Sequence, residues 1–139
     1  MKRILALAAV GLCLAVGGSA HAALKPEVRF VKGTTSTTLK SAVVRGDNDV
    51  WRVAGKAGQT IKLDIAAPEN NAVFQVYAPG ARMGHDEVGW SFAGKTLPGA
   101  GEGQDARHIV AKMPTNGMYL IVVGATRGNA AYTLAISIR

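Results

Sequence analysis

The chain has 139 residues and a formal net charge of +7, from 16 Lys and Arg residues against 9 Asp and Glu residues. The basic residues are scattered, with no basic helix and no aromatic-rich sheet motif, which argues against a nucleic-acid-binding protein. Cys13 is the only cysteine, so an intramolecular disulfide is excluded.

The first 22 residues have the pattern of a secretory signal peptide. A basic start precedes an apolar run over residues 4–16, and Ala20-His21-Ala22 is an A-x-A cleavage sequence. We expect cleavage after Ala22 and export to the periplasm, with no membrane attachment afterwards, so residues 1–22 are a signal peptide and residues 23–139 are one domain. This domain keeps 14 Lys and Arg residues against 9 Asp and Glu residues, a charge of +5 that favours anionic partners in general.

Alternation of apolar and polar residues predicts β-strands throughout the exported domain, and no stretch has a helical period of 3.6 residues. The clearest segment is residues 46–65, where two turns rich in Gly, Asp and Asn flank alternating apolar residues. We expect a β-hairpin there, with one dry face and one wet face. Its strands are at 49–54 and 60–66, and the other predicted strands are at 27–32, 39–44, 73–77, 107–113, 118–123 and 132–139.

Residues 81–106 differ from the rest because they contain six glycines and one proline. So long a loop inside a compact domain is often functional. Within it we expect one short strand at 88–93, which carries Trp90 and Phe92. The strand at 118–123 is apolar throughout, so we expect it to be buried on both faces.

Eight or nine short strands predict an all-β fold, specifically a single antiparallel β-sandwich. A hydrophobic core without a disulfide must then stabilise the domain. The predicted core residues are Phe30, Trp51, Val53, Ile61, Leu63, Ile65, Phe74, Val76, Tyr119, Ile121, Val123, Tyr132, Leu134 and Ile136.

Residues that could carry catalysis or bind a metal do not form a recognisable motif. The run His85-Asp86-Glu87, with His108 further on, matches no zinc spacing, and a solvated loop explains it better. Asp47 and Asp49 resemble half a calcium loop without its closing carboxylate, and turn hydrogen bonds explain them better. No nucleophile motif is present. We therefore expect no enzyme activity, no metal and no cofactor.

Arg127 lies in the short turn 124–129 between two well-patterned strands. An arginine at a hairpin tip has a fixed Cα and a mobile guanidinium, which matches a carboxylate bidentately. On the sequence alone, an ordinary solvated arginine is the simpler interpretation.

Six segments in chain order together resemble the periplasmic inhibitors of goose-type lysozyme. These segments are Arg29-Phe30-Val31-Lys32-Gly33, Gly46-Asp47-Asn48-Asp49-Val50-Trp51, Ala57-Gly58-Gln59, Tyr77-Ala78-Pro79-Gly80, Asn116-Gly117-Met118-Tyr119 and Thr126-Arg127. The segment from Gly46 to Trp51, together with Ala57-Gly58-Gln59, is also similar to the pre-peptidase C-terminal β-sandwich domain.

The resemblance implies an exported β-sandwich, a monomer or weak dimer, that blocks the active-site cleft of a lysozyme and so protects peptidoglycan. It implies partner contacts at Thr126 and Arg127 and at the turn with Gly46, Asp47 and Asp49, where Gly46 replaces an aromatic residue of the family. For one binding face, the turns 45–49 and 124–129 must lie at the same end of the molecule. With 88–93 counted as a strand, alternating strand directions place them together.

A second interpretation remains open, namely a non-catalytic module that binds glycan or peptidoglycan. It would use Trp90, Phe92 and Tyr77 as stacking platforms for sugar rings. Exposed aromatic rings in residues 81–106 would favour this interpretation, and buried rings would count against it.

Overall fold

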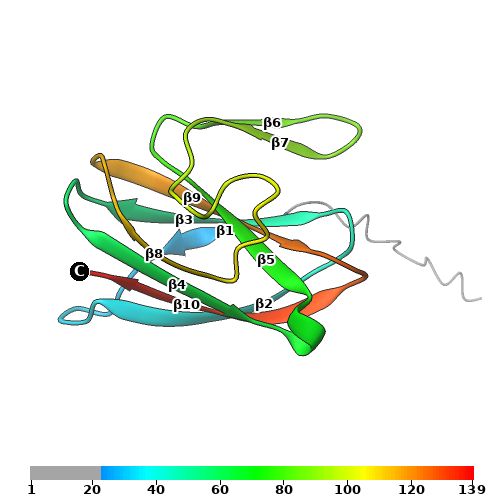
Figure 1. Ribbon diagram of the computed structural model, residues 1–139, viewed down its shortest axis with the longest axis horizontal. Helices are drawn as coiled ribbons and strands as arrows, with labels where there is room; N and C mark the ends of the chain where they lie inside the picture. The colour runs from blue at the N-terminus through cyan, green and yellow to red at the C-terminus, as the bar shows by residue number, and fades with distance from the viewer. Residues whose placement is uncertain (1–22) are drawn as a thin grey trace, which may run out of the picture.

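The computed structural model describes residues 23–139, which form ten β-strands and one turn of 3-10 helix (Figure 1). The predicted all-β fold is therefore confirmed, and the predicted signal peptide lies outside the described residues. Within 23–139, no helix is long and apolar enough to cross a membrane. The elements are β1 (Ala23–Val28), β2 (Ser36–Val43), β3 (Asn48–Gly55), β4 (Thr60–Ala66), η1 (Pro68–Asn70), β5 (Ala72–Tyr77), β6 (Arg82–His85), β7 (Trp90–Ala93), β8 (His108–Lys112), β9 (Gly117–Ala125) and β10 (Ala130–Ile138).

Two four-stranded sheets share one hydrophobic core. The first sheet has the strand order β1-β3-β9-β5 and the second has the order β2-β10-β4-β8. A separate two-stranded sheet, β6–β7, projects above the first sheet (Figure 1). The predicted single antiparallel sandwich of eight or nine strands is thus corrected in three respects. There are ten strands, β1 pairs with β3 in parallel, and β6–β7 belongs to neither large sheet.

The predicted core is confirmed, since each of its members is buried except Phe30, which is partly buried and packs against the others. A second, smaller apolar cluster lies on the outer face of the first sheet and contains Val50, Tyr77, Leu120 and Val122. The prediction that 118–123 is buried on both faces is therefore confirmed for residues 119–123 of β9, whereas Met118 is exposed.

The predicted hairpin of residues 46–65 is wrong, because β3 belongs to the first sheet and β4 to the second. Trp51 and Val53 share one hydrophobic core with Ile61 and Leu63, but the two pairs come from different sheets. Strands that face each other across a core alternate in the same way as strands that pair, so local alternation cannot separate the two cases. The turn that carries Arg127 likewise joins β9 to β10 in the other sheet, so it is not a hairpin tip.

Three strand boundaries also differ from the predictions. The strand predicted at 27–32 is β1 at Ala23–Val28, whose pairing with β3 shifts register between Leu24 and Glu27, around a proline that cannot donate to the ladder. β2 begins at Ser36, within a segment predicted as loop, because Thr and Ser are well tolerated in strands. The strand predicted at 88–93 exists as β7, and it pairs with the unpredicted β6.

Three connections that pass from one sheet to the other lie at the same end of the molecule. They are residues 44–47 between β2 and β3, residues 67–71 between β4 and β5, and residues 126–129 between β9 and β10, and we call them together the crossover end. The turns 45–49 and 124–129 therefore lie side by side, as one binding face requires.

Candidate functional site

The turn at residues 126–129 is fixed by one buried side chain, Asn71, which is 8% exposed. The Asn71 amide nitrogen donates to the carbonyl oxygens of Arg127 and Asn129, the latter at 3.1 Å. Its Oδ1 accepts from the Thr126 hydroxyl at 2.8 Å and from the Arg127 backbone N–H at 2.6 Å. The Thr126 backbone N–H adds a bond to the Asn71 carbonyl at 3.0 Å. The backbone at Arg127 is thus held from both sides.

The Arg127 side chain extends from this fixed backbone into solvent and is 70% exposed. One guanidinium nitrogen lies 3.8 Å from a carboxylate oxygen of Glu69 and 3.4 Å from the Glu69 carbonyl oxygen. Glu69 is itself 81% exposed, and ion pairs this open contribute little because solvent screens them. The guanidinium can therefore leave Glu69 for another carboxylate at small cost.

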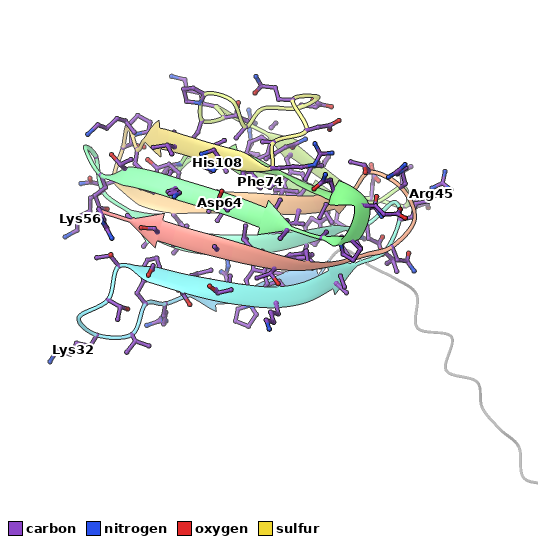
Figure 2. All side chains as sticks on the ribbon, turned by 60° about the horizontal axis from the view of Figure 1, so that its bottom comes forward. Lys32, Arg45, Lys56, Asp64, Phe74 and His108 are labelled. Atoms are coloured by element: carbon purple, nitrogen blue, oxygen red, sulfur yellow. The ribbon has the colours of Figure 1, made fainter. Side chains whose placement is uncertain are left out.

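Two further arginines belong to the same end. Arg45 is exposed, and its backbone N–H donates to the Asn129 side chain at 3.1 Å, which ties the first crossover to the third. Arg107, just before β8, is exposed and donates from Nε to the Asn70 carbonyl oxygen at 3.1 Å. Figure 2 shows Arg45 at this end of the molecule and Lys56 at the opposite end. Three guanidinium groups outnumber the two carboxylates of this end, Glu69 and Asp47, so the crossover end carries a net positive charge.

Gly46 and Asp47 contribute to the shape of the first crossover. Gly46 has φ of 83°, a left-handed conformation that favours glycine over the aromatic residue expected from the resemblance. The Asp47 backbone N–H donates to the Val44 carbonyl at 3.1 Å and closes the turn. Asp47 Oδ2 is buried without a hydrogen-bond partner among the described residues.

Asp49, predicted to contact a partner, is only 3% exposed and faces the interior. Its Oδ2 accepts from the Tyr132 hydroxyl at 2.7 Å and from Ser41 at 3.1 Å, while Oδ1 lies 3.6 Å from the Lys25 ammonium. Trp51 Nε1 in turn donates to the Tyr132 oxygen at 2.8 Å. Asp49 therefore joins β1, β2, β3 and β10 beneath the crossover end and does not reach the surface.

Burial, followed by the hydrogen bond to Asp49, raises the pKa of Tyr132 above its ordinary value. The phenol is therefore kept protonated and donates to the carboxylate. The Lys25 ammonium also lies 6.0 Å from the Trp51 ring centroid, within cation–π range.

The aromatic residues predicted as sugar platforms lie away from the Arg127 turn, where β7 packs over β5. Tyr77 is 5% exposed, whereas Phe92 and Trp90 are half-buried. The Tyr77 and Phe92 rings stack with centroids 5.7 Å apart, and Phe92 and Trp90 with centroids 6.4 Å apart. The rings thus form one row, in which Tyr77 is structural and Trp90 lies at the outer end.

The residues considered for catalysis are separated in space. Asp86 Oδ1 accepts the backbone N–H groups of Val88 and Gly89 at 2.8 and 3.1 Å, so this carboxylate stabilises the β6–β7 turn. His108 contacts Asp64 across β8 and β4 on the second sheet (Figure 2). Among residues 23–139, no group of three or more His, Cys, Asp or Glu residues is placed to hold a metal.

The most connected residue of the crossover end, Asn71, was not predicted from the sequence. Asn71 is one of two asparagines in a turn of residues 67–71, and its partners lie 55 to 58 positions later in the chain. Only the adjacency of the second and third crossovers reveals its role. The one local signal was the pair Asn70-Asn71 directly before a strand, which also fits an ordinary turn.

No protein-family model and no curated protein sequence matches the chain. Solved structures do match. PliG of Aeromonas hydrophila, a periplasmic inhibitor of g-type lysozyme, aligns at 31% identity with a TM-score of 0.63, over 81% of this chain and 94% of that one. PliG of Salmonella Typhimurium aligns at 19% identity with a TM-score of 0.59, over 84% and 99%. A PliG mutant from Escherichia coli aligns at 21% identity with a TM-score of 0.57, over 81% and 96%.

The Salmonella and E. coli structures share the fold of this chain. The A. hydrophila protein adds 31% sequence identity over 94% of its own length. The chain belongs to the family of periplasmic inhibitors of g-type lysozyme.

Proposed function

We propose that residues 23–139, released from a signal peptide at residues 1–22, act in the periplasm as a lysozyme inhibitor. The family and its A. hydrophila member support this function, since that relative is a periplasmic inhibitor of g-type lysozyme. The observation that carries the proposal is the contrast at residue 127. The backbone there is hydrogen-bonded to Asn71, while the guanidinium is 70% exposed.

The crossover end would enter the active-site cleft of the lysozyme with Arg127 foremost. Lysozymes act through carboxylic acids in their cleft. A planar guanidinium binds a carboxylate with two parallel hydrogen bonds, and the attraction is stronger in a partly dry cleft than at an open surface. Because Arg45 and Arg107 surround Arg127 with the same charge, the whole end is attracted to an acidic cleft before contact.

Rigidity of the turn contributes to affinity in this proposal. A mobile loop must be ordered when it binds, and that ordering lowers the affinity. Here the bonds from Asn71 already fix the backbone at Arg127, so only the arginine side chain has to be ordered. Asp49 supports the same end from below through its bonds to Tyr132 and Ser41.

The test is the clearing of bacterial cell-wall suspensions by a g-type lysozyme, with and without the mature chain. We expect inhibition by the parent protein and an inhibition constant at least about 30-fold weaker for Arg127→Ala, because truncation of one partner of a buried charge pair has that effect. Arg139→Ala is the matched control, since Arg139 is an exposed arginine outside the crossover end.

Two results would count against the proposal. If the parent chain inhibits neither g-type nor other lysozymes, the proposed function is wrong. Equal inhibition by Arg127→Ala and the parent would remove the cleft-entry mechanism even if the function is real.

A further inference from the structure

The β6–β7 sheet and the first large sheet form the two sides of a groove. β6–β7 projects above β5 and β9 (Figure 1). The groove has a volume of about 360 Å³, within the range of small-molecule sites. It lies on the outer face of the first sheet, so it is separate from the hydrophobic core between the large sheets.

Aromatic rings from both β5 and β7 form part of the groove lining. They are the row of Tyr77, Phe92 and Trp90, in which adjacent rings are inclined by only 29° and 23°. His85 packs with its ring edge against Trp90 at a centroid distance of 4.9 Å, which supports the Trp90 ring from β6. The Phe92 and Trp90 rings are half-buried, so part of each remains accessible from the groove.

Polar side chains form most of the remaining lining of the groove. Asn48, Gln75, Ser91 and Glu102 line it. The Tyr77 hydroxyl donates to Gln75 Oε1 at 2.8 Å, which leaves the Gln75 amide nitrogen to donate to a ligand. Burial and the nearby charge of Glu102 raise the pKa of Tyr77, so its hydroxyl stays a donor at neutral pH.

This combination narrows the chemistry of the ligand. Aromatic faces bind the C–H faces of sugar rings, and amide and carboxylate groups bind hydroxyls, whereas the groove lining contains no Lys or Arg for a phosphate or carboxylate. A cationic ligand fits Glu102 but is disfavoured by the 14 basic against 9 acidic residues of the domain. We propose that this groove binds a neutral saccharide built of pyranose rings.

The groove continues into a neighbouring hollow. A second hollow of about 170 Å³ shares Asn48, Gln75 and Val122 with the first and reaches Thr126. A saccharide chain that starts on Trp90 would thus run across the outer face of the first sheet toward the crossover end. Affinity should therefore rise from a monosaccharide to a tetrasaccharide. The inference stands on this groove alone and does not depend on lysozyme inhibition.

The experiment is a titration of the mature chain, followed by NMR, with soluble tetrasaccharides of β-1,4-linked N-acetylglucosamine and of β-1,4-linked glucose. We expect at least one of them to shift the amide signals of β5, β7 and β9. Binding of both indicates recognition of the ring faces, and preference for the first indicates an added contact with the acetamido group.

Variants test whether the saccharide binds in this groove. Trp90→Ala should weaken saccharide binding about tenfold, because the stacking face is lost. Glu102 is exposed and lies outside every strand, and glutamine has nearly the same shape, so Glu102→Gln should leave the fold unchanged. The same substitution should weaken saccharide binding. Val110→Ala is the control, since Val110 is 60% exposed on the second sheet. Circular dichroism verifies that each variant is folded.

Three outcomes would overturn the proposal. The first is that neither tetrasaccharide binds. The second is that Trp90→Ala and Glu102→Gln bind as the parent does. The third is that a tetralysine peptide binds more tightly than both saccharides and loses binding in Glu102→Gln, which would make the groove a site for cations.

Discussion

Replacement of Asn71 by alanine tests whether the crossover end is preorganised. The substitution removes the four side-chain hydrogen bonds to Thr126, Arg127 and Asn129. Each contributes about 1 kcal/mol net, and water at the surface replaces part of the loss, so we expect the free energy of unfolding to fall by about 3 kcal/mol. The bond from the Thr126 N–H to the carbonyl of residue 71 remains available, so the turn loosens without detachment.

Urea unfolding measures the fall in the free energy of unfolding. With a slope of about 1.5 kcal/mol per molar urea, a loss of this size lowers the midpoint by about 2 M. Cell-wall clearing measures the effect of the substitution on inhibition. A loosened turn should weaken inhibition about tenfold, because the turn must then be ordered on binding. Inhibition must be compared at temperatures where the variant is folded.

Asn116→Ala is the matched control for Asn71→Ala. Asn116 accepts a single bond, from the Ala57 N–H at 2.7 Å, between connections outside the crossover end. Asn116→Ala should lower the free energy of unfolding by less than Asn71→Ala does and should leave inhibition unchanged. The reasoning is refuted if Asn71→Ala keeps the parent's urea midpoint, or if it lowers the midpoint but inhibits as strongly as the parent.

The remaining predictions concern charges. Glu69→Gln frees the Arg127 guanidinium and should strengthen inhibition by no more than about fivefold. This effect should vanish in high salt. Weaker inhibition by Glu69→Gln than by the parent in low salt would contradict the prediction. Asp49→Ala leaves Lys25 and Tyr132 without their buried acceptor and should lower the free energy of unfolding by about 3 to 5 kcal/mol in urea titrations, whereas a loss below about 1 kcal/mol would contradict the network. Because the pKa of Tyr132 is raised in the folded state, the unfolded chain releases this proton first, so stability is full below about pH 10 and falls as pH rises further. Tyr132→Phe should flatten that alkaline fall, and an unchanged slope would show that another group causes it.

The strands of the large sheets were predictable because their apolar residues recur at every second position. That pattern identified β3, β4, β5 and β10, an unbroken apolar run identified β9, and together they gave nearly all of the core. It could not assign strands to sheets, since alternation is the same in a hairpin and in a crossover. The parallel pairing of β1 with β3 could not be predicted either, because the two strands are distant from each other in the sequence.

The candidate site was predictable only in part. Arg127 and Gly46 were identified from turn chemistry and from the resemblance, and the structure places both on the crossover end. Asp49 was predicted to lie in a surface turn that contacts a partner, yet Tyr132, which is 83 positions away, donates to it in the interior. Charges and amides whose partners come from distant strands cannot be recognised from local pattern.

The surface that meets lysozyme should be the crossover end, with Arg127 foremost. NMR of the labelled mature chain, titrated with a g-type lysozyme whose catalytic acid is replaced, maps that surface directly. We expect signals to shift or broaden at residues 44–47, 67–71 and 126–129 and to stay unchanged around Lys56 and Asn116. Changes confined to the region of Lys56 and Asn116, or none at all at equimolar lysozyme, would contradict this expectation.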